Sequence, residues 1–336
     1  MKILIYSPYF YPRIGGLETV VSILAYELVA QGHEVKLVSQ TPTKDIKDFP
    51  FEVIRKPNLK NLLYLTSWCD IFFQGCISLK GIFPLLMVPK PLFVTHQTWY
   101  LRSNGRPGWQ DYLKQFVTHF ATNISASSAV AAHLSATSTV IPNPYQEETF
   151  YLIPEIIRDR ELIFLGRLVP DKGVDLLLEA LSQLKAKGLT PSLTIVGNGP
   201  EESKLRQQAI ELGIETQVEF VGAKIEIELN RLLNAHQILV VPSRWQEPFG
   251  VVALEGIACG CVVVGSEGGG LKDAIGPCGV TFPNSDVKSL TKILADLLNH
   301  PGKLSTYREN AKQHLVRHQK AEVAKAYLKV FERALQ

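Results

Sequence analysis

Two glutamates, Glu247 and Glu255, stand with seven residues between them in the segment that runs from Arg244 to Glu255. Glu247 follows the strand pattern of residues 238–242 and lies in a loop, whereas Glu255 lies inside the apolar helix predicted over 251–259. The start of a helix presents unpaired N–H groups and a partial positive charge, which suits a phosphate. Burying an unpaired carboxylate is costly, so Glu255 needs a partner. The two carboxylates are typical of a site that binds the hydroxyls of a sugar and of a ribose.

Two cations follow the strand predicted over 161–165. Arg167 ends that strand, and Lys172 comes five residues later, just before a helix. Two positive charges there would neutralise a diphosphate and stabilise it as it leaves. Either of these two cations, taken alone, could equally be an ordinary charged residue on the protein surface. Gly166 and Gly173, which flank them, favour the interpretation as a binding site.

Further candidates follow strands in the first half of the chain. Gly15 and Gly16 come after the first strand and before a helix, where glycine lets the backbone approach a ligand closely. They do not form a GxGxxG motif, so a dinucleotide site is not indicated, and a plain tight turn stays the alternative. His96 ends the strand 92–95 and could bond a sugar hydroxyl. Ser125, at the next strand end, is a second candidate for the same pocket.

A series of alternating strand and helix patterns occurs twice along the 336 residues. This length suits two domains of roughly 150 residues each. Apolar strands separated by helices indicate parallel sheets covered on both faces. We expect an α/β protein with two Rossmann-like, doubly wound domains facing a central cleft, over 1–145 and 146–318, and a helix within 319–336 that packs back on the first domain. Pro142–Arg160 reads as the linker. The pattern predicts single helices over 109–120 and 304–318, and no helix between the strands at 51–54 and 70–74.

Composition excludes several classes of protein. The net charge of +3 is spread along the chain without a basic stripe, so nucleic acid is not expected as a partner, although an anionic membrane surface could attract the chain modestly. Five cysteines without framework spacing indicate reduced thiols in the cytosol. The apolar start is too short for a signal peptide, and residues 82–94 are too short to span a membrane. We expect a cytoplasmic protein, at most peripheral at the inner membrane face.

At this point the sequence resembles a known family. The Glu247/Glu255 pair is similar to the paired-glutamate motif of retaining glycosyltransferase family four (glycosyl transferases group 1), which has the two-domain B-type glycosyltransferase fold. The resemblance extends over essentially the whole chain and is most specific in the second half. Its other elements are Ile14-Gly15-Gly16, Gly166-Arg167 with Lys172-Gly173, Val196-Gly197-Asn198-Gly199-Pro200, Phe220-Val221-Gly222 and Gly268-Gly269-Gly270.

The resemblance implies retaining transfer from a nucleotide-diphosphate sugar such as a UDP- or GDP-sugar. Arg167 and Lys172 would grip the diphosphate, Glu247 the transferred sugar and Glu255 the ribose, with His96 on the sugar. No residue is an evident covalent nucleophile, so a front-face route is expected, in which the leaving phosphate accepts the proton of the acceptor. The chain has no Asp-x-Asp motif and no metal-ligand spacing, so we expect no metal cofactor. Further donor-binding positions are Gly15, Gly16, Ser125, Asn198, Gly199, Gly222, Phe249, Gly250 and Val251.

The acceptor side gives a weaker pattern. One short segment contains several aromatic and basic residues: Trp99, Tyr100, Arg102, Arg106 and Trp109. The aromatic rings could stack on sugars, and the basic side chains could bind an anionic or lipid-phosphate acceptor. An ordinary surface loop fits the pattern as well. We expect a hydroxyl acceptor that is a glycan, a polysaccharide or a lipid-linked sugar. A sugar-nucleotide epimerase of the same fold and a non-catalytic nucleotide-sugar binding protein remain alternatives. The oligomeric state does not follow from the sequence.

Overall fold

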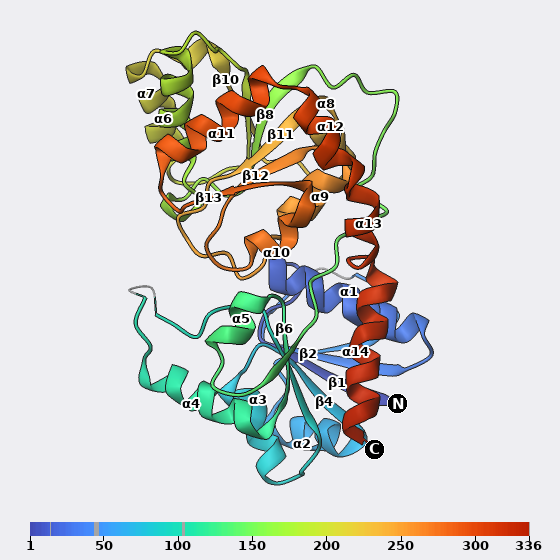
Figure 1. The fold of residues 1–336 in the computed structure, drawn as a ribbon. Coiled ribbons are helices and arrows are strands. Elements are labelled where there is room, and N and C mark those ends of the chain that lie inside the picture. Colours follow the sequence, from blue (N-terminus) through green and yellow to red (C-terminus); the bar gives the residue numbers. More distant parts are fainter. Residues whose placement is uncertain (14, 44–46, 103–104, 336) are drawn as a thin grey trace. The chain divides into compact units, whose positions relative to one another are not determined.

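A computed structural model describes residues 1–13, 15–43, 47–102 and 105–335 (Figure 1). The chain divides into two compact units, each with its own sheet. Unit 1 comprises Met1–Pro144 together with Lys320–Gln336, and unit 2 comprises Tyr145–Gln319. The boundaries expected from the sequence were after residues 145 and 318.

Unit 1 is built on a seven-stranded parallel sheet with the order β3-β2-β1-β4-β5-β6-β7. Alternate residues of β1 point to opposite faces: Ile3 and Ile5 join one core cluster, and Leu4 and Tyr6 join the other. The sheet is therefore covered on both faces, as the apolar strand patterns predict. The strands are β1 Lys2–Ser7, β2 Glu34–Ser39, β3 Glu52–Arg55, β4 Ile71–Gly75, β5 Leu92–His96, β6 Thr122–Ser125 and β7 Ser138–Val140.

One face of this sheet is covered by α1 and α14, which lie alongside one another (Figure 1). In α14 the hydroxyl of Tyr327 lies 2.7 Å from Oγ1 of Thr95, and the ring of Phe331 packs 4.7 Å from that of Phe93. The last helix is thus part of the core of unit 1. The helices of unit 1 are α1 Gly16–Ala30, α2 Leu59–Trp68, α3 Leu79–Ile82, α4 Trp109–Val117, α5 Ser128–His133 and α14 Lys320–Leu335, with short 3-10 helices η1 Phe83–Leu86 and η2 Thr118–Phe120.

Three predicted helix assignments are wrong. The helix α2 exists where none was expected, and its signal is the N-cap residue Asn58, whose side chain accepts the N–H of Asn61. The expected helix over 304–318 is two helices, α12 and α13, which meet at Asn310. The expected helix over 109–120 is α-helical only to Val117 and finishes as the 3-10 helix η2.

Unit 2 is built on a six-stranded parallel sheet with the order β10-β9-β8-β11-β12-β13. One face packs on α6 and α11 through a cluster that includes Leu177, Ile195, Val240 and Leu294. The strands are β8 Arg160–Leu165, β9 Leu193–Val196, β10 Val218–Gly222, β11 His236–Val241, β12 Val262–Ser266 and β13 Gly279–Phe282. The helices are α6 Val174–Lys185, α7 Glu202–Glu211, α8 Glu226–Ala235, α9 Val251–Ala258, α10 Leu271–Ile275, α11 Val287–Asn299, α12 Gly302–Glu309 and α13 Ala311–Val316, with 3-10 helices η3 Pro170–Lys172, η4 Glu215–Gln217 and η5 Gly276–Cys278.

Both sheets follow the doubly wound strand order, in which the first strand lies next to the fourth and the chain reverses direction across the sheet. The predicted pair of Rossmann-like domains is confirmed. All five cysteines are buried and unbridged. None of the helices in the described ranges is long and apolar enough to cross a membrane.

The expected linker is wrong for much of its length, because residues after 145 pack on unit 2. The side chain of Asn234 accepts the N–H of Ile153 at 2.8 Å and donates to the carbonyl of Tyr151 at 3.0 Å. Arg158 donates to the carbonyls of His236 and Cys259, at 2.5 and 2.6 Å. These backbone partners lie far along the chain, so the polar composition of the segment did not reveal them.

Candidate active site

The second-half candidates gather at the carboxyl ends of β8 and β11 in unit 2. These two strands are neighbours at the point where the strand order reverses, which is where doubly wound sheets bind ligands. Arg167 and Lys172 follow β8, and Glu247 follows β11. The fold therefore brings together residues that are far apart in the sequence.

Lys172 and Glu247 form an ion pair. Nζ of Lys172 lies 2.5 Å from Oε1 of Glu247, and the hydroxyl of the buried Ser243 donates to the same oxygen at 2.8 Å. The carbonyl of Glu247 accepts the N–H of Gly270 at 2.7 Å, and Glu247 also forms a β-bridge with Gly269. The backbone and carboxylate of Glu247 are thus held by its own loop and by two others, those of Lys172 and of Gly269–Gly270.

Gly173 allows the loop after β8 to approach the end of β11. It has φ +67°, and a Cβ added there would lie 2.1 Å from the carbonyl oxygen of Pro242. Only glycine adopts this backbone without strain and leaves room for that oxygen. The preceding residue, Lys172, is placed beside Glu247 by this close approach.

Two residues that the sequence analysis did not single out hold the Glu247 loop. Asp175 receives two parallel hydrogen bonds from Arg244, one of them 2.7 Å long. These bonds raise the pKa of Arg244 above its ordinary value. Asn284 donates to the carbonyls of Ser243 and Arg244 at 3.1 and 3.3 Å, and it accepts the N–H of Gly268 at 2.7 Å. The sequence signal that could have indicated Asn284 is its position as a polar residue just after a strand.

Arg167 is exposed, and its guanidinium has no hydrogen-bond or ion-pair partner among the residues that the structure describes. Lys172, by contrast, is already paired with Glu247. An exposed, unpaired cation beside a paired one leaves positive charge available to an anionic ligand at this edge.

Glu255 lies in α9, half-buried, and no described residue pairs with its carboxylate. Burial raises the pKa of Glu255 from 4.5 to about 7. An unpaired carboxylate in an apolar helix is costly, so the arrangement favours a ligand that donates hydrogen bonds to it. The two residues that precede this helix are fixed by packing: Phe249 is buried against the ring of His318, and Gly250, at φ +95°, leads into Val251, the first residue of α9.

The loops after β9 and β10 are tightly packed. Asn198 accepts the N–H of Ala223 at 3.0 Å, next to Gly222, which has φ +71°. A Cβ on Gly199 would lie 2.1 Å from the carbonyl oxygen of Leu168. Contacts within the protein alone therefore require glycine at 199, and the donor-binding role of Asn198, Gly199 and Gly222 stays a prediction.

His96 requires a correction. It is fully buried, with Nδ1 2.6 Å from the hydroxyl of Tyr100 and Nε2 3.0 Å from Oδ1 of Asn123. Because Oδ1 can only accept, Nε2 carries the proton and Tyr100 donates to Nδ1. Burial lowers the pKa of His96 to about 4. The imidazole is therefore neutral and has no nitrogen left for a sugar, and the buried Tyr100 does not offer its ring for stacking.

The other candidate site residues of unit 1 are Ser125, Gly15 and Gly16. The hydroxyl of Ser125 is buried and lies 2.7 Å from that of Ser138, so it does not face a ligand. Gly15 caps α1 in extended conformation, and a Cβ on Gly16 would meet no atom within 4 Å. Ile14 lies outside the described residues.

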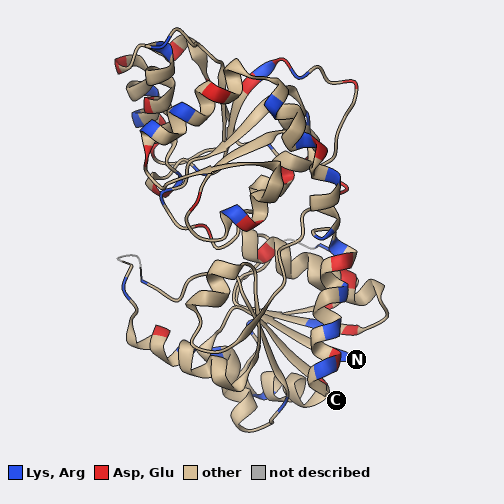
Figure 2. Cartoon of the chain, viewed as in Figure 1, with Lys and Arg blue, Asp and Glu red and all other residues tan. Residues whose placement is uncertain are grey.

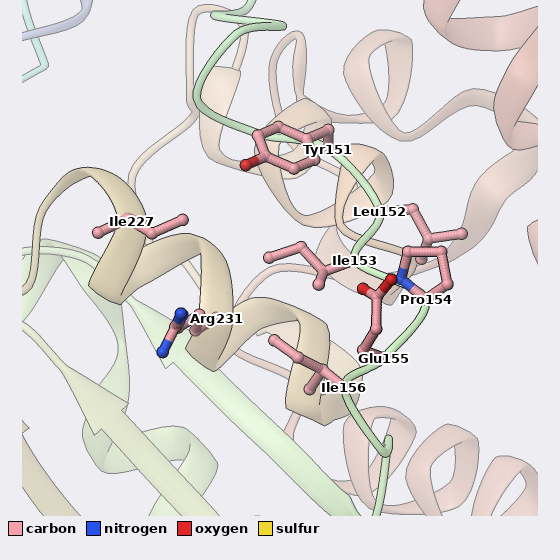
Figure 3. A pocket seen from close by; sticks show the side chains of 8 residues that line it. All are labelled: Tyr151, Leu152, Ile153, Pro154, Glu155, Ile156, Ile227 and Arg231. Atoms are coloured by element: carbon pink, nitrogen blue, oxygen red, sulfur yellow. The ribbon is translucent and has the colours of Figure 1, made fainter.

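A hollow of about 580 Å³ lies elsewhere in unit 2, between the segment after residue 150 and α8 (Figure 3). Its lining is mostly apolar, with Arg231 and Glu155 as the charged side chains. None of the site residues predicted from the sequence lines it. Among the described residues, no group of three or more His, Cys, Asp or Glu side chains is placed to hold a metal ion.

Comparison with known proteins assigns this unit to a family. Residues 154–314 match the family described as glycosyl transferases group 1, and they cover nearly all of unit 2. Unit 2 is a glycosyl transferases group 1 domain, and the resemblance inferred from its motifs is confirmed.

Named relatives match slightly less than half of the chain. The chain is 36% identical over 157 residues to a glycogen synthase of Mycobacterium tuberculosis, which is 46% of this chain and 38% of that protein. It is 33% identical over 148 residues to the GDP-mannose-dependent alpha-(1-6)-phosphatidylinositol monomannoside mannosyltransferase of Mycolicibacterium smegmatis, which is 42% of this chain and 39% of that protein. The chain thus spans about two fifths of the length of these relatives.

The fold is shared more widely. The structure of the Anabaena protein HepE in complex with UDP superimposes on 99% of this chain and 100% of that one, with a TM-score of 0.82 and 19% identity. At this identity the likeness concerns the fold, which is the predicted B-type glycosyltransferase fold.

Proposed function

We propose that this protein is a retaining glycosyltransferase that moves a sugar from a nucleotide-diphosphate sugar to a hydroxyl acceptor. The observation that carries the proposal is the meeting of Lys172 with Glu247 at the point where the strand order of unit 2 reverses, with the unpaired Arg167 after the same strand as Lys172. This edge offers cations for a diphosphate and a carboxylate for sugar hydroxyls.

Arg167 and Lys172 bind the diphosphate of the donor in this proposal. Their charges stabilise the negative charge that develops as the bond between sugar and phosphate breaks. The N–H groups at the start of α9 support the same phosphates. Because two cations neutralise the diphosphate, the reaction requires no metal ion.

The two glutamates have separate roles. Glu247 accepts hydrogen bonds from hydroxyls of the transferred sugar, and Glu255 accepts them from the ribose, which supplies the missing partner of its carboxylate. Neither acts as a covalent nucleophile. The acceptor hydroxyl attacks from the face that the diphosphate leaves, and the departing phosphate oxygen takes its proton, so the anomeric configuration is retained.

The names of relatives and of a structural neighbour support the proposed donor class. One is named as GDP-mannose-dependent, and the HepE structure holds UDP, which supports a UDP- or GDP-sugar donor. A glycan or a lipid-linked sugar is the proposed acceptor, at the cytoplasmic face of the membrane.

A donor screen tests the proposal directly. A nucleotide sugar present at 100 times its Kd should stabilise the fold by about 2.7 kcal/mol, which a thermal-shift panel of UDP- and GDP-sugars detects. The best donor is then incubated with and without acceptors, and the anomeric configuration of the product is read by NMR.

Three results would contradict parts of the proposal. An altered sugar formed from donor alone would indicate an epimerase. Loss of turnover in EDTA that Mg²⁺ restores would remove the metal-free mechanism. Donor binding without any product across glycan and lipid-linked acceptors would leave a binding protein.

A further inference from the structure

The helix α4 and the turn η2 carry an apolar stripe that faces outward. Trp109, Tyr112, Leu113, Phe116 and Phe120 have exposed fractions of 66, 64, 41, 59 and 70%. Their spacing of three, four, seven and eleven residues from Trp109 places them on one side of a helix. In a globular domain such a stripe normally packs on the core, so its exposure here requires an explanation.

Polar residues occupy the inner side of the same helix. Gln115 donates to the carbonyl of His133 at 3.1 Å and accepts the N–H of Ser135 at 2.9 Å. Asp111 is buried and accepts the N–H of Gly108 at 2.9 Å, and the carbonyl of Thr118 accepts from Asn123 at 2.8 Å. Asp111 thus caps the start of its own helix, whereas Gln115 and Thr118 bond the polar side to other segments of unit 1, and turning the apolar stripe inward would break the bonds of Gln115 and Thr118.

A second exposed apolar group lies on the same layer of unit 1. Leu79, Ile82 and Leu85 of α3 and η1 pack against the core cluster that also receives Val117 of α4, and Figure 1 shows the two segments near one another. The exposed apolar residues of this segment are Phe83 and Leu86 of η1 and the adjacent Met87. We call the combined set the outer face; it comprises Phe83, Leu86, Met87, Trp109, Tyr112, Leu113, Phe116 and Phe120.

The charged residues in the segment that carries the outer face are mostly basic. Residues 71–146 contain five Lys or Arg and one acidic residue, Asp111, which is buried, whereas the rest of the chain holds 30 basic and 31 acidic residues. The positive net charge is therefore concentrated in this segment, contrary to the even spread expected from the sequence. Lys80 and Arg102 of this segment are exposed. Figure 2 shows α4 mostly in tan, whereas α6 and α7 carry many residues of both charges.

We propose that the outer face docks on an anionic phospholipid membrane. Aromatic and aliphatic side chains of a surface helix enter the boundary between headgroups and acyl chains, where Trp and Tyr are preferred, and nearby bases attract anionic headgroups. A second copy of the chain is a poorer occupant, because pairing through this face would bring two positively charged segments together.

The test is vesicle binding by the whole protein, without donor or acceptor, so that its outcome is independent of the proposed enzymatic function. Co-sedimentation is measured with vesicles of phosphatidylcholine and with vesicles that also contain phosphatidylglycerol. The wild type should bind the second kind more tightly, and added salt should weaken that binding. Trp109→Ser combined with Phe116→Ser should bind at least about tenfold more weakly.

Two further variants complete the design. Ile210→Ser, at an exposed apolar position of α7 in unit 2, is the matched control and should bind like the wild type. Lys80→Gln combined with Arg102→Gln should lose most of the preference for phosphatidylglycerol. Unchanged circular dichroism and melting temperatures show that the variants fold. Absent or equal binding to both vesicles, or a dimer that Trp109→Ser with Phe116→Ser dissociates, would overturn the proposal.

Discussion

Nζ of Lys172 lies 2.5 Å from Oε1 of Glu247, although 75 residues separate them in the sequence. The cation proposed to bind the diphosphate and the carboxylate proposed to bind the sugar are therefore partners before any donor arrives. Side-chain exposures of 27 and 12% leave the pair partly open to solvent. A donor that binds here must share Lys172 between its phosphates and Glu247.

Lys172→Met should abolish most of the transfer activity. The substitution removes a charge that stabilises the leaving diphosphate and deprives Glu247 of its partner, so kcat should fall by about 10²- to 10³-fold. Initial rates at saturating donor measure the effect. Lys303→Met, which breaks an exposed ion pair with Asp296, is the control and should keep wild-type rates. An unaffected kcat in Lys172→Met would remove this residue from the mechanism.

Glu255 predicts a pH-dependent affinity for the donor. With a pKa of about 7 in the free protein, the carboxyl is mostly protonated at pH 6 and ionised at pH 8. If the ionised form accepts the ribose hydroxyls, the Kd for a nucleotide sugar should be about tenfold weaker at pH 6 than at pH 8. Calorimetric titrations give the Kd values. Glu255→Gln should bind more weakly than the wild type at pH 8 and lose this dependence, while Glu247→Gln should keep it.

The same carboxyl should shape the stability of the free protein. Its folded-state pKa lies above its ordinary value of 4.5, so the stabilisation is complete below pH 4.5 and is lost as the pH rises through about 7. Urea unfolding at several pH values should show this loss in the wild type and a flatter profile in Glu255→Gln. Parallel profiles would mean that Glu255 does not carry the effect.

Asp175→Asn should reduce activity without a direct contact to the donor. The two hydrogen bonds from Arg244 hold the loop that carries Glu247, and weakening them should lower kcat/KM by about tenfold through misplacement of that carboxylate. Asp296→Asn, in an exposed pair with Lys303, is the control. Wild-type kinetics in Asp175→Asn would show that the loop holds its geometry without this pair.

Gly173→Ala should destabilise unit 2 more than a substitution at a glycine with similar φ. A Cβ at 173 meets the carbonyl oxygen of Pro242 at 2.1 Å, whereas Gly188, at φ +80°, has no atom within 4 Å of its added Cβ. We expect at least about 2 kcal/mol for Gly173→Ala and about 1 kcal/mol for Gly188→Ala, measured by urea unfolding. Equal losses would mean that the Pro242 contact relaxes freely.

The sequence predicted the alternation of strands and helices because each apolar run has its own period, and it predicted Glu247, Lys172 and Arg167 because each follows a strand of a parallel sheet. The sequence did not predict which side chains bond to one another. The bonds of His96 to Tyr100 and Asn123, and of Arg244 to Asp175, depend on side chains that come together only in the folded protein.

The orientation of the helix α4 is another feature that the sequence does not determine. Its period reveals an apolar side and a polar side, but the period does not say which side faces the core. Here Gln115 bonds inward to His133 and Ser135, Asp111 is buried, and Trp109 faces outward, which reverses the usual assignment. Only the hydrogen bonds of the polar side decide between the two orientations.

The helix α14 makes unit 1 discontinuous, and this governs the order in which the chain can fold. Residues 145–319 form unit 2 without interruption, so this unit can fold as soon as it has left the ribosome. Unit 1 has all its strands before unit 2 in the sequence, but Tyr327 and Phe331, which complete one face of its core, are synthesised after unit 2. Unit 1 is therefore finished only after unit 2, and one apolar face of its sheet stays incompletely covered while unit 2 is made.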